Sequence, residues 1–135
     1  MPPKIIPDTI MLDASVLIDH FRKRNRKNTF YTKIVQQYDF RLVSAVAKFE
    51  VLYETRYETV EYWNGVFATM TVVPFTDDIV SKSHEIVLDL KRKSILLDME
   101  DIMIAASAII YNVPLATLNR KHFERVDGLK LIDNT

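Results

Sequence analysis

The segment Thr9-Ile-Met-Leu-Asp-Ala-Ser-Val-Leu-Ile-Asp-His-Phe21 decides the fold, because it joins a strand pattern to a helix pattern through a carboxylate. The apolar run Thr9–Leu12 predicts a short strand, and apolar residues recur at helical spacing from Val16 onwards, with Ser15 as the expected cap. Asp13 stands between them, at the position where open α/β sheets bind ligands. A carboxylate there can also serve only the helix N-terminus, so capping and catalysis both stay open for Asp13.

Strand and helix patterns alternate along the rest of the chain. Strands are expected over 40–43, 70–73, 113–117 and 129–132, and helices over 30–37, 45–58, 76–93 and 100–111, with a short helix or a turn over 59–65. Alternation without a hairpin signal predicts a central, mainly parallel sheet with helices on both faces. We therefore predict a three-layer α/β/α fold, as a single domain over residues 1–135.

Two segments are expected to supply much of the core. The stretch 100–111 is the most apolar helix pattern, which is typical of a helix covered on most sides. The aromatic residues Tyr57, Tyr62, Trp63 and Phe67 are expected to be buried, with a partner or dimer surface as the alternative.

Composition excludes several classes of protein and site. The absence of cysteine excludes a disulfide framework and a thiolate metal site or nucleophile. Gly65 and Gly128 are the only glycines, which excludes the dinucleotide fingerprint, the Walker loop and the G-x-S-x-G nucleophile elbow. No run approaches the roughly 18 consecutive apolar residues of a membrane span. We expect no membrane association, and a cytoplasmic location fits this composition.

The charge balance argues against sequence-independent binding of duplex nucleic acid. The chain has 18 basic and 18 acidic residues, whereas such proteins carry a strong basic excess. Local basic runs nevertheless occur at Arg22–Lys27 and Lys91–Lys93. Each run is compatible with a solvated helix end or with a rim that holds a phosphate backbone.

Three acids on separate predicted elements are expected to meet at one edge of the sheet: Asp13, Glu50 and Asp101. Structural alternatives exist, because Asp98 and Asp101 have the spacing of a capping pair and Glu50 could pair with a lysine or arginine. An unpaired carboxylate is costly to bury, so a cation should satisfy the cluster. Without a His/Cys ligand set, a cluster of oxygen ligands suits Mg²⁺ or Mn²⁺ rather than zinc.

The histidines are less informative than the acids. His20 and His84 lie in the middle of predicted helices, where packed or surface positions are the ordinary interpretation. His122 lies near the expected edge, where it could touch a substrate without being catalytic.

Four segments, in this order, resemble PIN domains, and specifically the VapC-type ribonuclease toxins of bacterial and archaeal toxin–antitoxin systems. They are Leu12–Asp19, Ser44–Glu50, Asp101–Ala108 and Ala116–Val126, so that the resemblance spans nearly the whole chain. It implies a PIN-like α/β/α fold and Mg²⁺- or Mn²⁺-dependent cleavage of RNA. It also implies a homodimer and a small antitoxin protein that inserts residues into the active site.

The resemblance assigns roles to individual positions. Asp13, Glu50 and Asp101 match the family's three acids, which would hold the metal ion. Asn119 matches a fourth position, which is aspartate in many members and asparagine in others. Ser15 and Thr117 match the polar residues that border the site, and Arg120 and Lys121 could grip the RNA backbone.

Two departures from the family pattern affect the expectation. Ala47 replaces a common threonine or serine, which should perturb little. Asn119 in place of an acid would weaken a second metal site, so one or two ions remain possible, and Asp98 could act as an accessory acid.

Two rival interpretations belong to other functional classes. A signalling receiver domain would place a phosphoacceptor aspartate directly after a central strand, but the strand over 70–73 runs into Pro74 and Phe75 instead. A catalytically silent PIN-like binding module would use the fold only to hold a partner, and the intact acids argue against it.

Overall fold

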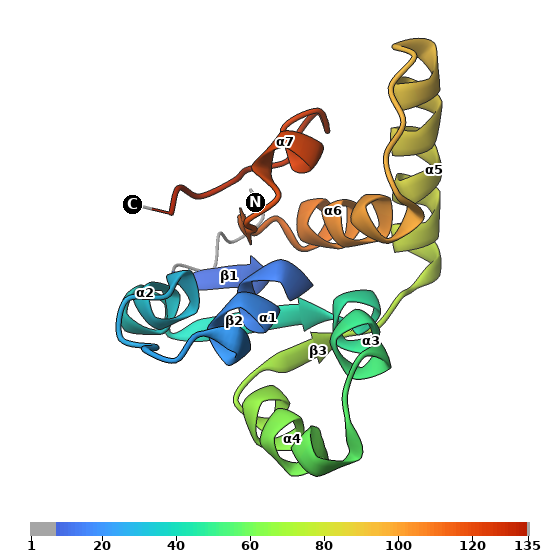
Figure 1. Cartoon of the computed structure of the whole chain (residues 1–135). Helices are drawn as coiled ribbons and strands as arrows, with labels where there is room; N and C mark the ends of the chain where they lie inside the picture. Colours follow the sequence, from blue (N-terminus) through green and yellow to red (C-terminus); the bar gives the residue numbers. More distant parts are fainter. Residues whose placement is uncertain (1–7, 135) are drawn as a thin grey trace.

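The computed structural model describes residues 8–134 and contains a four-stranded sheet in which every pairing is parallel (Figure 1). The strands are β1 (Thr9–Leu12), β2 (Phe40–Ser44), β3 (Thr71–Val73) and β4 (Leu115–Ala116), in the order β3-β2-β1-β4. The chain moves outwards from β1 through β2 to β3 and then returns to β4 on the other side of β1. The switch point, where open α/β sheets bind ligands, therefore lies between the carboxyl ends of β1 and β4.

Helices flank the sheet, and the predicted three-layer α/β/α fold is confirmed. They are α1 (Ala14–Arg22), α2 (Phe30–Gln37), α3 (Ala45–Tyr53), the 3-10 turn η1 (Tyr57–Thr59), α4 (Val60–Ala68), α5 (Asp77–Arg92), α6 (Met99–Tyr111) and α7 (Arg120–Phe123). Figure 1 shows α1 and α2 in front of the sheet and α5 as a long arm packed against α6. Helix α3 contacts both α1, which directly follows Asp13, and α6, which carries Asp101.

The burial of β1 and α6 agrees with their apolar sequences and with the position of β1 inside the sheet. Every residue of β1 is buried, as expected for a strand of a parallel sheet that is covered on both faces. In α6 the residues from Ile104 to Ala108 are all buried, which confirms the predicted covered helix. Within residues 8–134, no helix has the length and apolar character needed to cross a bilayer.

The helix caps include one that the sequence pattern did not predict correctly, at the start of α1. Thr29 and Ser44 cap α2 and α3, with hydroxyl oxygens that accept hydrogen bonds from the third backbone N–H beyond them at 3.2 and 3.0 Å. Helix α1 begins earlier than expected, at Ala14, so that Asp13 rather than Ser15 is its N-cap residue. The Asp13 side chain makes no capping hydrogen bond. The Asp13 carboxylate therefore does not cap the helix, which was one of the two roles that the sequence left open.

Helix α3 ends at Tyr53, before the predicted boundary at residue 58. The Thr55 hydroxyl donates to the carbonyl of Val51 at 2.9 Å, and a side chain that binds a backbone carbonyl in this way competes with helix continuation. The aromatic prediction is partly confirmed, because Trp63 and Phe67 are buried. It is wrong for Tyr57, which lies in η1 beyond the shortened helix and is 92% exposed.

The chain beyond β4 differs from the prediction in two respects. The strand expected over 129–132 reduces to an isolated parallel bridge between Leu131 and Leu115. It can extend no further because β4, its neighbour, has only two residues. The short helix α7 was not predicted, since four residues carry too little periodicity to reveal a helix.

Candidate active site

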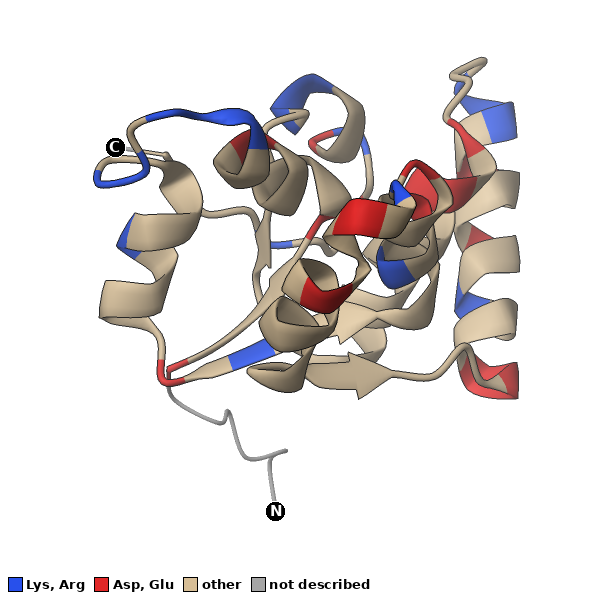
Figure 2. Cartoon of the chain, turned by 60° about the horizontal axis from the view of Figure 1, so that its bottom comes forward, with Lys and Arg blue, Asp and Glu red and all other residues tan. Residues whose placement is uncertain are grey.

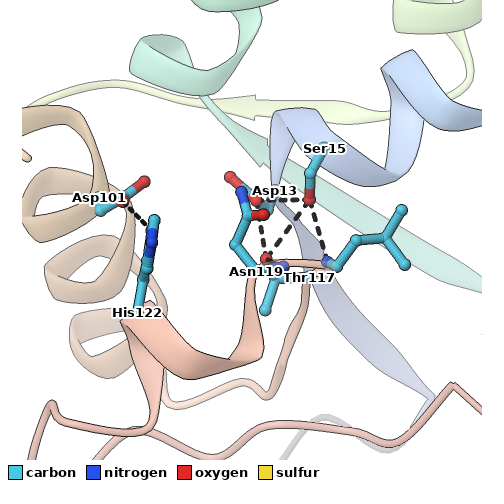
Figure 3. A network of polar contacts seen from close by, with 7 residues as sticks. Asp13, Ser15, Asp101, Thr117, Asn119 and His122 are labelled. Carbon is cyan, nitrogen blue, oxygen red and sulfur yellow. Dashed lines mark hydrogen bonds and ion pairs between the residues drawn. The ribbon is translucent and has the colours of Figure 1, made fainter.

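Asp13 is held at the switch point by two hydroxyl groups, as Figure 3 shows. Its side chain is buried (3% exposed), and Oδ2 accepts hydrogen bonds from Ser15 Oγ at 2.6 Å and Thr117 Oγ1 at 2.8 Å. Each hydroxyl oxygen in turn accepts from a backbone N–H, Ser15 from Leu118 and Thr117 from Asn119, both at 3.0 Å. The hydroxyl protons are thereby directed to a carboxylate that can only accept when ionised.

The adjacency of β1 and β4 builds this network from residues far apart in the chain. Leu12 pairs with Ala116, and the Asp13 N–H donates to the Ala116 carbonyl at 2.9 Å, which continues the ladder one residue beyond β1. The residues that follow the two strands, Asp13 and Thr117, therefore face each other.

Glu50 reaches the same cleft from α3, and one of its carboxylate oxygens lacks a hydrogen-bond donor among the described residues. Its Oε1 is buried and has no hydrogen-bond partner within residues 8–134, so the alternative of a lysine or arginine partner gains no support at this atom. Burial raises the pKa of Glu50 from 4.5 to about 7, and the negative charges of Asp13 and Asp101 add to the increase. At neutral pH this carboxyl group is poised between its protonated and ionised forms.

Asp101 lies in the first turn of α6 and is paired with His122. The Nδ1 atom of His122 is 3.2 Å from Asp101 Oδ2, and Figure 3 shows the ring standing against the carboxylate. Burial raises the pKa of Asp101, as does the charge of Asp13, while the contact with His122 opposes the increase. Asp98 is the N-cap residue of α6 but makes no side-chain capping bond, and its charge also raises the pKa of Asp101.

The three acids line one cleft of about 610 Å³ between α1, α3, α6 and the segment after β4. Its lining also includes Ser15, Asn119, Asp19, Arg22, Lys23 and Glu54. In Figure 2, acidic segments from several elements gather near the middle of the view. The predicted convergence of Asp13, Glu50 and Asp101 is therefore present in the geometry.

Other predicted residues lie outside the lining. Arg120 pairs with Asp133 at 3.0 Å and donates to the Ile132 carbonyl at 3.3 Å, and Lys121 is exposed beside it on α7. Of the two basic runs, only the first contributes to the cleft, through Arg22 and Lys23. In the second run, Lys93 is engaged by Asp89 and Asp127 at the end of α5.

Sequence reasoning missed two acids of the lining, Asp19 and Glu54. Glu54 directly follows α3 and lies four residues after Glu50, a spacing that places side chains on one helix face. That spacing was the signal that could have identified it.

The oxygen atoms of the cleft fit a hydrated Mg²⁺ or Mn²⁺ ion. No three His, Asp or Glu side chains of the described part form a ready-made ligand set for direct coordination. Mg²⁺ usually keeps several waters and takes only one or two carboxylates, so such a set is not required. Glu50 Oε1 is a buried acceptor without a donor, and Asp13 accepts both hydroxyl protons on Oδ2, leaving Oδ1 for an ion or its waters.

Comparisons with known proteins agree with this geometry. Residues 10–129 match the PIN domain. Ribonuclease VapC1 of Methanocaldococcus jannaschii is 35% identical over 127 residues, which cover 92% of this chain and 87% of that protein.

Solved structures resemble the fold over almost its whole length. The DNA-bound VapBC structure from Salmonella typhimurium has a TM-score of 0.83 at 20% identity and covers 94% of this chain and 98% of that one. VapBC-1 from nontypeable Haemophilus influenzae has a TM-score of 0.79 at 20% identity, with 93% and 98% covered.

Proposed function

This chain belongs to the PIN domain family, and from that premise we propose that it is a metal-dependent endoribonuclease, the toxin of a type II toxin–antitoxin system. The observation that carries the proposal is the convergence of Asp13, Glu50 and Asp101 on one cleft at the switch point of the sheet. Hydrolysis of an RNA phosphodiester needs positive charge beside the phosphate. A divalent metal ion supplies this charge, and this cluster of acids is suited to hold such an ion.

The three acids share one part in the proposed reaction. Asp13, Glu50 and Asp101 would hold the ion directly or through its waters, with Asp13 kept in place by its two hydroxyl donors. When bound, Mg²⁺ or Mn²⁺ supplies a coordinated water of lowered pKa and polarises the phosphoryl oxygen. The Asn119 amide, which lines the cleft, orients a water or the phosphate.

The rim of the cleft offers cations for the RNA backbone. Arg22 pairs with Glu54 at 3.7 Å and Lys23 with Asp19 at 3.5 Å, and both pairs are solvent-accessible. Exposed ion pairs contribute only about 0–1 kcal/mol, so a phosphate group can replace the carboxylate at little cost. Arg120 and Lys121 on α7 are proposed to add further contacts with the RNA backbone. Ser15 and Thr117 are proposed to border the substrate.

We propose that one ion is bound tightly. Asn119 contributes no negative charge at the fourth position of the site, and Asp98, the acid that the sequence offered as a substitute, is exposed at the N-cap of α6 and does not line the cleft. Asp98 is therefore proposed as an accessory acid for a second, weaker ion.

The proposed partner is a small antitoxin, since the solved relatives include VapBC complexes. A cavity of about 450 Å³ between α1 and α4, which contains Phe21 and Trp63, suits an apolar side chain of that partner. The cavity shares Ile18, Arg22 and Glu54 with the acid cleft. An antitoxin segment anchored in this cavity would lead into the acid cleft, where a basic side chain of the antitoxin would pair with the acids.

A second copy of this chain is the other proposed partner. Phe49 and Tyr53 on α3 are largely exposed, with ring centroids 5.9 Å apart, and they border a groove of about 320 Å³ whose lining also includes Glu100. Large aromatic side chains gathered on a surface are typical of protein interfaces. The cytoplasm is the proposed location, since it would hold both the RNA and the antitoxin.

The test is cleavage of a panel of structured RNAs with Mg²⁺, Mn²⁺ or EDTA by the wild type, Asp13→Asn and Asp101→Asn, together with a Mn²⁺ titration. Cleavage that requires the metal and is lost in both variants supports the proposal. Full metal-dependent cleavage by Asp13→Asn would contradict the proposal. A folded protein that neither binds Mn²⁺ nor cleaves RNA would instead be a catalytically silent binding module.

A further inference from the structure

The acids of the cleft differ in whether a hydrogen-bond donor holds them. Asp13 receives protons from two hydroxyl groups, whereas Glu50 Oε1 has no partner in the described part of the chain. Asp101 has one side-chain partner there, the imidazole of His122. This histidine has no part in the reaction described above, yet it contacts one of the three acids directly.

The position of His122 is built into the backbone. It lies on α7, where its N–H donates to the Asn119 carbonyl at 3.0 Å. Its neighbour Phe123 is fully buried, and Arg120 ties the start of α7 to Asp133. Because α7 is anchored on both sides, the fold places the backbone of His122 within reach of Asp101.

The direction of the contact follows from the charge of Asp101. When this carboxylate is ionised it can only accept hydrogen bonds, so the 3.2 Å contact then requires the tautomer of His122 that carries a proton on Nδ1. The His122 side chain is 50% exposed and that of Asp101 only 13%, so the ring shields the carboxylate from solvent. Engagement of Oδ2 leaves Oδ1 as the oxygen of Asp101 available to the cleft that this residue lines.

We propose that His122 is a positioning residue of the metal site, whose Nδ1–H fixes the Asp101 carboxylate so that Oδ1 is presented to the ion or its waters. The inference rests on the proposed function and deepens it. Without this donor, Asp101 would face Asp13 and Glu50 across the cleft with nothing to determine its rotamer. Removing a partner that orients a metal ligand typically costs roughly 10–100-fold in metal affinity.

The experiment compares His122→Ala with His122→Asn in the full chain. An asparagine amide can place an N–H donor close to the position of Nδ1, whereas alanine cannot. His84→Ala, on the exposed face of α5 and outside the cleft, is the matched control. The measurements are the Mn²⁺ dissociation constant, the metal dependence of RNA cleavage, and the Tm of the metal-free protein.

In His122→Ala, we expect Mn²⁺ binding to weaken by at least about tenfold, with cleavage recovered at high Mn²⁺ and a metal-free Tm close to that of the wild type. His122→Asn should recover most of the lost affinity, and His84→Ala should bind like the wild type. Unchanged Mn²⁺ affinity in His122→Ala overturns the inference, and so does a lowered Tm as its only effect. An asparagine variant as weak as the alanine variant also overturns it.

The failure of this inference can be told apart from failure of the proposed function. A wild type that binds Mn²⁺ and cleaves RNA, with His122→Ala indistinguishable from it, removes only the role of His122. A wild type that does neither removes the proposed function and the role of His122 together.

Discussion

The Thr117 hydroxyl donates a 2.8 Å hydrogen bond to Asp13 Oδ2 and so joins residues 104 positions apart. The bond spans the switch point between β1 and β4, where the first strand of the chain meets the last. The same hydroxyl oxygen accepts from the Asn119 N–H, so a single threonine connects the most buried acid to the segment that carries Asn119 and leads into α7.

Replacing Thr117 by valine keeps the shape of the side chain and removes the hydroxyl. The half-buried hydrogen bond from the Asn119 N–H and the buried donor to Asp13 are then lost, which should lower the free energy of unfolding by about 1–3 kcal/mol and reduce RNA cleavage. Urea denaturation and cleavage rates measure both effects. Thr69→Val, an exposed threonine whose hydroxyl binds a local carbonyl, is the control and should change stability by less than about 0.5 kcal/mol. Equal effects of the two substitutions would contradict the prediction.

The raised pKa of Glu50 predicts a pH-dependent stability of the metal-free protein. Between pH 4.5 and about pH 7, Glu50 keeps its proton in the folded state but has lost it in the unfolded state. Stability due to this group is therefore fully present below pH 4.5 and is lost as pH rises through about 7. The shift corresponds to roughly 3 kcal/mol at most, and solvent screening of a half-buried group reduces it to about 1–2 kcal/mol.

The measurement is the free energy of unfolding of wild type and Glu50→Gln from pH 4 to pH 8. The wild type should lose stability relative to Glu50→Gln as pH rises, because the glutamine cannot ionise. Glu61→Gln, on the exposed part of α4, supplies the background for removing a surface carboxylate. A stability difference between wild type and Glu50→Gln that is constant across this range would contradict the raised pKa.

The same carboxyl group makes Mn²⁺ binding pH-dependent, because a proton and the ion compete for Glu50. With a pKa of about 7, the affinity should be about tenfold weaker at pH 6 than at pH 8. Calorimetry at pH 7 in buffers of different ionisation enthalpy should detect proton release on binding. Binding without proton release would mean that Glu50 lies outside the ion's ligands.

Removing the Arg22 side chain should weaken RNA binding and leave the protein stable. Arg22 lines the cleft, and its exposed pair with Glu54 contributes only about 0–1 kcal/mol to folding. In Arg22→Ala, we expect a raised KM and a salt dependence of binding shallower by about 0.7 per lost phosphate contact on single-stranded RNA. Arg92→Ala, at the far end of α5 in an exposed pair with Asp89, is the matched control. An equal KM change in both variants would indicate a non-specific charge effect.

An acidic substitution on α3 tests the proposed contact between two copies. Tyr53 is 78% exposed and borders the groove beside Phe49, so Tyr53→Asp should convert a dimer into a monomer. Sedimentation equilibrium measures the change. Tyr57→Asp, at a more exposed tyrosine that does not line that groove, should leave the dimer intact. Dimers that persist in Tyr53→Asp would place the interface elsewhere.

Local sequence patterns were sufficient for most of the secondary structure. Short apolar and β-branched runs predicted all four strands of the sheet, and the fully apolar character of β1 matches its complete burial. The same patterns failed where the outcome depends on a neighbour. Leu131 forms only a bridge because its partner strand is two residues long, and Tyr57 is exposed because α3 stops at Tyr53.

By itself, the sequence determined where each acid lies relative to its strand or helix. It therefore indicated that Asp13, Glu50 and Asp101 would approach one edge of a parallel sheet. Only the tertiary structure decided how each acid is held: Asp13 by the hydroxyls of Ser15 and Thr117, Asp101 by His122, and Glu50 Oε1 by no partner in the described part. The physical reason is that periodicity records which face of an element is apolar, whereas a hydrogen bond across a sheet depends on strand order. The return of the chain to β4 beside β1 created the pairing that the sequence pattern does not contain.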